Sequence, residues 1–398
     1  MLSLRIALYE NTFKYFQLLS DSFLGCSTKV ALNRNKLMVL MVGPLPPPYG
    51  GIATFIENAV HYLNGSGEVQ VDVYRTGKRN WRISNLLHGI FEIFLLLQFV
   101  FSRKMSRYDI YHINTASYLS FIRNSLYVWV CKRLFKGRVI LHIHGGEFLK
   151  FYYNSGELVK SIVQSTLEIA DAVIVTSPSW VPKIKNVANL KKIYYLFNGF
   201  DKKALPCMNS KECRRILGLP FAKKILLNVG ILIEVKGHKY LINAMKEVIN
   251  ARTDVLCIII GDGPLRKKLQ QRVKELELSE YIKLVGPKPH NEIFLWMKAA
   301  DVFVLPSLNE GTPTVMFEAL GAGLPFIGTS VGGVPDIITS DEYGLLVDPA
   351  NPEDLSSKIL FALEKKWDKT KIMEYAEQFS WKRIAKYLIK LYERMLTN

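Results

Sequence analysis

Residues 301–325 read Asp301-Val-Phe-Val-Leu-Pro-Ser-Leu-Asn-Glu-Gly-Thr-Pro-Thr-Val-Met-Phe-Glu-Ala-Leu-Gly-Ala-Gly-Leu-Pro325. The apolar run 302–305 predicts a short buried strand, and residues 312–320 predict a helix with Thr312 as N-cap and Pro313 in its first turn. A strand end that leads into a helix start is typical of a parallel α/β sheet, which binds ligands at the carboxyl ends of its strands. The N–H groups of the first helical turn favour an anion such as a diphosphate.

Two carboxylates flank the start of this predicted helix. Glu310 precedes the helix, and Glu318 lies one turn beyond Thr314 on the same face. An ionised carboxylate only accepts hydrogen bonds, which suits the vicinal hydroxyls of a ribose or a hexose. From the spacing alone, a solvated loop glutamate followed by a helix-surface glutamate would be the more common interpretation.

The longer motif around these glutamates favours the first interpretation. Residues 309–325 resemble the Glu-x7-Glu signature of the family 4 glycosyltransferases, retaining sugar-nucleotide enzymes of the GT-B fold. The match includes the glycine and proline after Glu310, the alanine after Glu318, the following Gly-x-Pro, and the Gly332-Gly333-x-Pro335-Asp336 turn. The resemblance extends over about residues 36–395 and implies two Rossmann-like, doubly wound parallel-sheet domains with a cleft between them.

Alternating apolar strands and amphipathic helices agree with that fold class, α/β. The expected division is an N-terminal extension (1–35), an acceptor-side domain (36–200), a nucleotide-sugar domain (201–375) and a helix that crosses back to the first domain (376–398). Residues 1–35 lack the uninterrupted apolar core of a secretory signal. The sequence leaves open whether they form an interfacial helix, a docking arm or a simple leading segment.

Two glycine-containing strand ends supply further candidate residues. Gly50 and Gly51 end a proline-rich turn after the strand 36–42, and glycines let backbone N–H groups approach a phosphate. His144 ends the strand 139–144, just before two more glycines. The resemblance implies that Gly50 and Gly51 lie between donor phosphate and acceptor, and that His144 touches the donor hexose. His142 is expected to pack behind it, with Asp109 and Glu147 as further neighbours.

Lys236 lies in the segment 230–237, where the resemblance implies a cation for the diphosphate of leaving UDP or GDP. The arginine that the family usually has after Gly230 is replaced by Ile231. Either another base such as Arg266 or Lys288 substitutes, or turnover is slower, or the protein does not catalyse.

The resemblance therefore assigns His144, Lys236 and Glu310 to catalysis. It assigns donor binding to Gly50, Gly51, Gly311, Thr312, Pro313, Thr314 and Glu318, with hexose hydroxyls on Glu310 and ribose hydroxyls on Glu318. No Asp-x-Asp triplet is present, and neither a metal nor a cofactor is expected, because the nucleotide-sugar is a substrate.

Charge and hydrophobicity suggest an anionic partner for the first half of the chain, with a solvated basic surface that has no partner as the alternative. The net charge of +17 is concentrated in residues 1–195, which contain 23 Lys and Arg against 11 Asp and Glu. The segment 86–101 is apolar on nearly every side and is followed by basic residues. The segment 129–138 has a similar character, with apolar and basic side chains close together: Trp129, Cys131, Phe135, Lys132, Arg133, Lys136 and Arg138. Each is either a core helix or a helix that dips into the headgroup layer of a membrane. Nucleic acid is disfavoured because no recognised binding module is present.

Localisation is expected to be cytoplasmic, at the inner face of the plasma membrane. Five scattered cysteines without a Cys-x-x-Cys pair indicate a reducing compartment, and no run of about 18 apolar residues predicts a membrane span.

Three functions are compatible with the sequence. The first is a retaining glycosyltransferase that moves a hexose from a UDP- or GDP-sugar to a lipid-linked or polysaccharide acceptor. The second is a catalytically inactive homologue that serves as a partner subunit or membrane scaffold. The third is a Rossmann oxidoreductase, which is disfavoured because no Gly-x-Gly-x-x-Gly follows the first strand.

Overall fold

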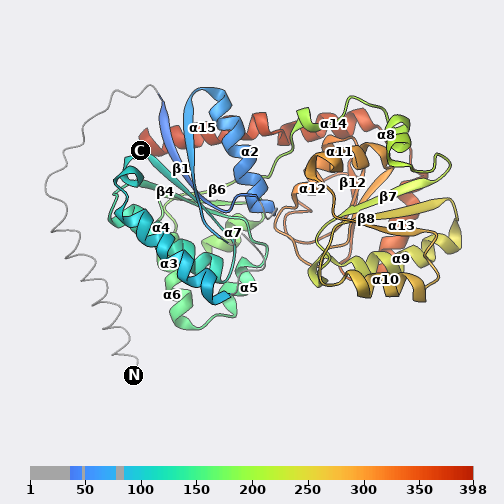
Figure 1. Cartoon of the computed structure of the whole chain (residues 1–398), viewed down its shortest axis with the longest axis horizontal. Helices are drawn as coiled ribbons and strands as arrows, with labels where there is room; N and C mark the ends of the chain where they lie inside the picture. The colour runs from blue at the N-terminus through green and yellow to red at the C-terminus, as the bar shows by residue number, and fades with distance from the viewer. Residues whose placement is uncertain (1–35, 47–49, 78–84, 398) are drawn as a thin grey trace.

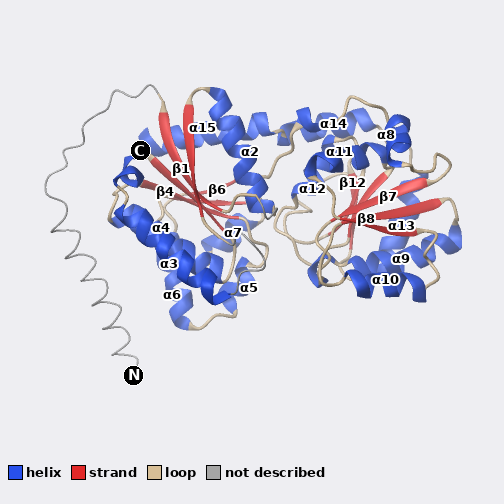
Figure 2. Ribbon diagram, in the orientation of Figure 1, coloured by secondary structure: helices blue, strands red, loops and turns tan. Residues whose placement is uncertain are grey.

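The computed structural model describes residues 36–46, 50–77 and 85–397, so the expectations for residues 1–35 lie outside it. The described chain forms two six-stranded parallel sheets covered by helices, which confirms the predicted fold class (Figures 1 and 2). Their strand orders are β2-β1-β3-β4-β5-β6 and β12-β11-β10-β7-β8-β9. We call them, with their helices, the N-terminal unit and the C-terminal unit.

The N-terminal unit is built on apolar strands that are buried on both faces, as expected of a parallel sheet. Its strands are β1 (Leu37–Gly43), β2 (Val69–Arg75), β3 (Ile110–Thr115), β4 (Arg138–Ile143), β5 (Ala172–Val175) and β6 (Ile193–Tyr195). Its helices are α2 (Gly51–Ser66), α3 (Asn85–Phe101), α4 (Leu119–Arg133), α5 (Phe148–Tyr153), α6 (Glu157–Ile169) and α7 (Trp180–Lys185).

The C-terminal unit repeats this plan. Its strands are β7 (Lys224–Val229), β8 (Val255–Ile260), β9 (Ile282–Gly286), β10 (Val302–Leu305), β11 (Phe326–Thr329) and β12 (Gly344–Val347). Its helices are α8 (Ser210–Leu217), α9 (His238–Ala251), α10 (Arg266–Glu275), α11 (His290–Ala299), α12 (Thr314–Gly321), α13 (Pro352–Glu364) and α14 (Lys369–Ala376).

Each sheet has a point where the strand order reverses. In the C-terminal sheet the chain runs from β7 outward to β9 and then returns to place β10 on the other side of β7. In the N-terminal sheet the reversal lies between β1 and β3. Ligands of doubly wound sheets bind at the carboxyl ends of the strands beside such a reversal. The loops after β1, β3, β7 and β10 are therefore the loops from which a site is expected.

The last helix, α15 (Trp381–Thr397), follows the C-terminal unit in sequence but packs on the N-terminal unit (Figure 1). Its buried residues recur every three or four positions and join the same core cluster as β1 and α2: Trp381, Ile384, Ala385, Leu388, Ile389, Leu391, Tyr392 and Met395. This amphipathic period gives the helix one apolar face, and burying that face fixes the end of the chain on the first sheet.

Within the part of the chain that the structure describes, no helix combines the length and the apolar character needed to span a bilayer.

Candidate active site at the junction of the two units

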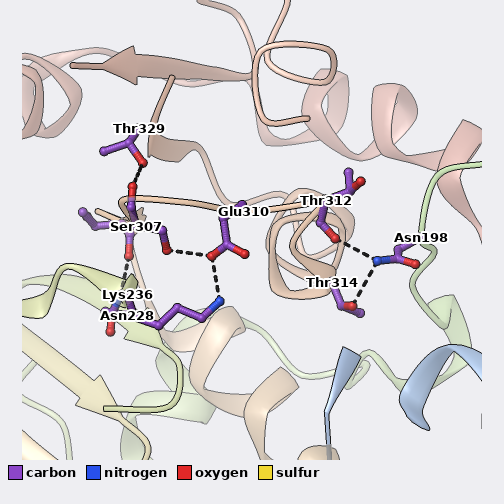
Figure 3. Close-up of polar contacts among 9 residues, drawn as sticks. Asn198, Asn228, Lys236, Ser307, Glu310, Thr312, Thr314 and Thr329 are labelled. Atoms are coloured by element: carbon purple, nitrogen blue, oxygen red, sulfur yellow. Dashed lines mark hydrogen bonds and ion pairs between the residues drawn. The ribbon is translucent and has the colours of Figure 1, made fainter. Parts of the chain in front are cut away.

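The loop after β10 brings two of the predicted catalytic residues together. Glu310 Oε1 accepts hydrogen bonds from Lys236 Nζ at 2.7 Å and from Ser307 Oγ at 2.6 Å (Figure 3). The Glu310 side chain is only 9% exposed, so its charge needs such a partner. Lys236 comes from the turn Glu234–Lys236 that precedes α9. Because an ammonium group has three N–H donors, Lys236 can hold Glu310 and also contact a phosphate.

The start of α12 differs from the prediction. The helix begins at Thr314 with Pro313 as its N-cap, so the expectation of Thr312 at that position was wrong. The Thr312 hydroxyl instead donates to the carbonyl of Thr176 at 2.9 Å, and Asn198 Nδ2 donates to the Thr312 carbonyl at 2.8 Å (Figure 3 draws the second bond). Thr312 is therefore occupied by contacts with residues outside its own loop and cannot cap the helix.

Exposure at the tip of α12 separates the predicted donor-binding residues into two groups. Gly311, Thr312 and Pro313 are buried, whereas Thr314 and the following Val315 are partly exposed. The first N–H groups of a helix have no acceptor within the helix. Access for an anion is thus at residues 314 and 315 rather than along the whole loop.

Glu318 is buried, and only one of its two carboxylate oxygens has a hydrogen-bond partner among the described residues. Its Oε1 lies 2.7 Å from His290 Nε2, and Oε2 has no hydrogen-bond partner among the described residues. The Glu318 side chain is 3% exposed. A buried carboxylate oxygen without a partner is costly, and a ligand hydroxyl would satisfy it. The geometry therefore agrees with a role in binding a diol.

His290 was missed in the sequence. It is the first residue of α11 and follows the loop after β9, so its position at a parallel strand end was the available signal. The hydrogen bond to Glu318 raises the pKa of His290 above its ordinary value, although burial opposes this rise. The imidazole is therefore biased towards the charged form that pairs with the carboxylate.

His144 follows β4 and lies within a group of aromatic rings. Its ring centroid is 3.8 Å from that of His142 and 4.8 Å from that of Phe55, so His142 packs against it as expected. His144 Nε2 is 2.9 Å from Asn114 Oδ1. Burial lowers the pKa of His144 to about 3, which keeps the imidazole neutral near pH 7.

Glycines allow the loops of the two units to touch. A Cβ added to Gly146 would lie 2.5 Å from the carbonyl carbon of Glu310, and one on Gly311 would lie 2.8 Å from the His144 oxygen. Gly51 faces the first residue of α12, since a Cβ there would be 4.0 Å from Thr314 Oγ1. His144, Glu310 and the Gly50-Gly51 turn are thus gathered around one junction.

Two further residues, Asp109 and Glu147, were expected near His144. Asp109 Oδ2 accepts from the Met38 amide at the amino edge of the sheet, so its expected place beside His144 was wrong. Glu147 pairs with Lys150 at 3.7 Å.

The two bases considered as substitutes at the Ile231 position have acidic partners. Arg266 Nη1 is 3.6 Å from Asp262, and Lys288 Nζ is 3.4 Å from Glu292. Ile231 itself is 47% exposed. Lys236, in contrast, forms its ion pair with Glu310 itself, at 2.7 Å.

No cluster of three or more His, Cys, Asp or Glu side chains in the described ranges is arranged to hold a metal ion. Metal-independent chemistry stays a prediction.

Two Rossmann-like units that meet at their strand ends define a chain with the GT-B fold, and comparisons with known proteins agree. Sucrose-phosphate synthase from Thermosynechococcus elongatus superposes with a TM-score of 0.73 at 22% identity, covering 91% of this chain and 100% of that one. The Anabaena protein HepE, solved in complex with UDP, gives a TM-score of 0.71 at 18% identity, covering 90% of this chain and 100% of that one. These likenesses establish the fold.

The second unit also matches at the level of sequence. Residues 209–379 match the family model described as "Glycosyl transferases group 1". D-inositol 3-phosphate glycosyltransferase from Corynebacterium urealyticum is 31% identical over 199 residues, which is 47% of this chain and 47% of that protein. The alignment therefore spans about half the length of this curated relative. The match to the family model lies within the C-terminal unit.

Proposed function

We propose that this protein is a retaining glycosyltransferase that moves a hexose, or a related sugar, from a UDP- or GDP-sugar to a lipid-linked or polysaccharide acceptor in surface glycan biosynthesis. The observation that carries the proposal is the buried Glu318, whose Oε2 has no partner among the described residues. The Lys236–Glu310 pair and the family match of residues 209–379 support it. HepE, which shares the fold, was solved with UDP, and this favours a nucleotide-sugar donor.

The proposed chemistry uses the junction as follows. The bond between the anomeric carbon and the diphosphate oxygen breaks while the acceptor oxygen bonds to the same face of that carbon. The acceptor proton passes to the departing phosphate. Lys236 and the partly exposed start of α12 stabilise the negative charge that develops on the diphosphate. Glu310 binds hexose hydroxyls, and Glu318 binds the ribose. No metal is needed, because these groups supply the positive potential.

A panel of UDP- and GDP-sugars tests the proposal through release of the nucleoside diphosphate. We expect release from at least one donor, increased by a lipid-linked or glycan acceptor. Glu318→Ala should abolish release and transfer, whereas Glu353→Ala, at an exposed position on α13, should leave both unchanged. Normal turnover by Glu318→Ala would refute the site assignment. Tight UDP or GDP binding without turnover in the wild type would favour the inactive-homologue alternative.

We also propose that the N-terminal unit binds the cytoplasmic face of an anionic membrane through α3. This helix buries Leu95 and Phe99 but exposes four large apolar side chains on its other side: Ile93 (62%), Phe94 (61%), Leu97 (47%) and Phe101 (76%). We call these four residues the α3 stripe. The core-helix interpretation thus describes one face of α3 only. A row of four large, exposed apolar side chains on one helix face is typical of an interaction surface.

Charge near the α3 stripe favours lipid as the partner. Lys104 and Arg107 follow the helix in the turn Arg103–Arg107, and both are exposed. Basic residues beside an apolar helix face suit anionic headgroups, each contributing about 1 kcal/mol.

Vesicle co-sedimentation tests this contact. We expect binding to phosphatidylserine-containing vesicles, and weaker binding to neutral vesicles or in high salt. Phe94→Asp combined with Phe101→Asp should release the protein. Phe361→Asp, at a 51% exposed position on α13, is the matched control and should leave binding intact. Equal binding by the α3 variant and the wild type would exclude the stripe as the contact.

A further inference from the structure

The orientation of one buried amide determines which hydrogen bonds His144 can make. Asn114 is the penultimate residue of β3 and is fully buried. Its Nδ2 lies 3.4 Å from the Val42 carbonyl oxygen and 3.3 Å from the His112 carbonyl oxygen. Carbonyl oxygens only accept hydrogen bonds, so the NH₂ group of the amide must face them. Asn114 Oδ1 is thereby turned towards His144.

This orientation fixes the tautomer of His144. Asn114 Oδ1 can only accept, and it lies 2.9 Å from His144 Nε2, so Nε2 must carry the proton. A neutral imidazole has one N–H group, which leaves Nδ1 with a free lone pair. The Asn114 backbone is itself held, because Asn124 Nδ2 donates to its carbonyl at 2.8 Å.

The surroundings keep His144 neutral. The titratable groups that face it are His142, stacked at 3.8 Å, and His112, whose Nε2 is 3.2 Å from His142 Nδ1. Helix α2 contributes the uncharged Phe55, which packs against His144. The hydroxyl of Tyr392, from α15, lies 2.8 Å from His112 Nδ1. Burial lowers the pKa of His112 to about 3 and that of His142 well below its ordinary value. None of these groups supplies a charge that would favour an imidazolium.

We infer that Asn114 is a positioning residue that holds His144 in the Nε2–H tautomer, so that the Nδ1 lone pair accepts a hydrogen bond from a hydroxyl of the transferred sugar. His144 is partly exposed, and no hydrogen bond among the described residues uses its Nδ1. The claim that a sugar hydroxyl donates this hydrogen bond rests on the proposed function. The assignment of the tautomer does not.

Nitrogen-15 NMR of histidine-labelled protein tests the tautomer without any substrate. The chain has seven histidines, and the signals missing from His144→Ala identify the pair of ring nitrogens in question. We expect a protonated Nε2 and an unprotonated Nδ1 that stay unchanged from about pH 8 down to about pH 5, well below the ordinary histidine pKa. A protonated Nδ1 in the wild type would overturn the inference, whatever the activity of the protein.

Two substitutions at Asn114 connect the tautomer to turnover. Asn114→Asp keeps an acceptor on Nε2–H but adds a charge that favours imidazolium, so its activity should fall as the pH is lowered while the wild-type activity changes less. Asn114→Leu removes the acceptor and should lower kcat about tenfold, the loss of one hydrogen bond, with little change in the KM for the donor. An Asn114→Leu protein with the wild-type tautomer and pH profile would contradict the positioning role.

A control variant, Asn243→Asp, measures the effect of the same amide-to-carboxylate exchange at a position away from the junction. Asn243 lies on α9, where Oδ1 accepts from Arg272 Nε at 3.1 Å, away from the junction. Asn243→Asp should keep the wild-type pH profile and histidine spectrum. If the wild type releases no nucleotide from any sugar donor, the proposed function fails, and the spectrum still decides the tautomer.

Discussion

Among the single side chains, the pair Glu318–His290 shows how burial and one hydrogen bond orient a carboxylate. His290 satisfies one oxygen of Glu318 and leaves the other without a described partner. His290 is the first residue of α11 and Glu318 lies in α12, so the two residues are 28 positions apart in sequence but in contact near the strand ends. The carboxylate is thus oriented by one unit of the fold before any ligand is present.

This pair makes the folding stability depend on pH. The hydrogen bond to Glu318 raises the folded-state pKa of His290 above the unfolded value of about 6.5. The stabilisation is therefore fully present below that unfolded value and is lost as the pH rises through the folded pKa. We expect His290→Leu to destabilise the protein by about 1 to 3 kcal/mol near pH 6, because it removes the hydrogen-bond partner of the buried Glu318 carboxylate.

Urea unfolding of wild type and His290→Leu between about pH 6 and about pH 9 measures this effect, and the stability difference should shrink as the pH rises. His290→Gln, which retains an N–H donor, should lose less than His290→Leu. A stability difference that grows towards alkaline pH would show that the pair does not act as described.

Among the elements, α15 shows that sequence order and packing partner can differ. Leu388 is fully buried in the cluster that contains β1 and α2, although it follows the C-terminal unit. We expect Leu388→Ala to cost about 2 to 5 kcal/mol, the usual range for a buried leucine. Hydrogen exchange should increase in β1 and α2 and stay unchanged in β7 and β8.

Lys390→Ala is the control for this prediction, because Lys390 is exposed on the same helix. It should leave both the unfolding free energy and the exchange pattern unaltered. Increased exchange confined to β7 and β8 in Leu388→Ala would mean that α15 stabilises the other unit.

The elements also show which parts of the molecule can be predicted from the sequence. Periodicity and strand-end glycines were sufficient for the alternating α/β plan, because apolar period and turn chemistry are local properties. The start of α12 was predicted two residues early, since Thr312 is used by Thr176, a contact that no local pattern reveals. The roles of His290 and Asn114 were not predicted for the same reason. Their partners, Glu318 and His144, lie 28 and 30 residues away in the sequence, so no local pattern reveals the contacts.

At the scale of the whole molecule, the two units meet through backbone as well as side chains. Gly146 follows β4 and lies against the Glu310 carbonyl, and Asp336 Oδ2 accepts from the Ser179 amide at 3.2 Å across the junction. Close approach of two backbones requires a residue without a side chain at the contact. The position of Glu310 relative to His144 is therefore set by the fit of two loops that belong to different sheets.

Gly146→Ala tests this dependence. The added methyl group would lie 2.5 Å from the Glu310 carbonyl carbon, so the loops must separate while each sheet keeps its own core. We expect at least a tenfold loss of transfer, since misplacement by about 1 Å can cost a hundredfold. Small-angle X-ray scattering should show a larger radius of gyration with unchanged far-UV circular dichroism. Gly156→Ala, where an added methyl group meets nothing within 4 Å, should behave like wild type in both measurements. Full activity of Gly146→Ala in the same compact form would show that the junction tolerates separation of the loops and that Glu310 need not approach His144.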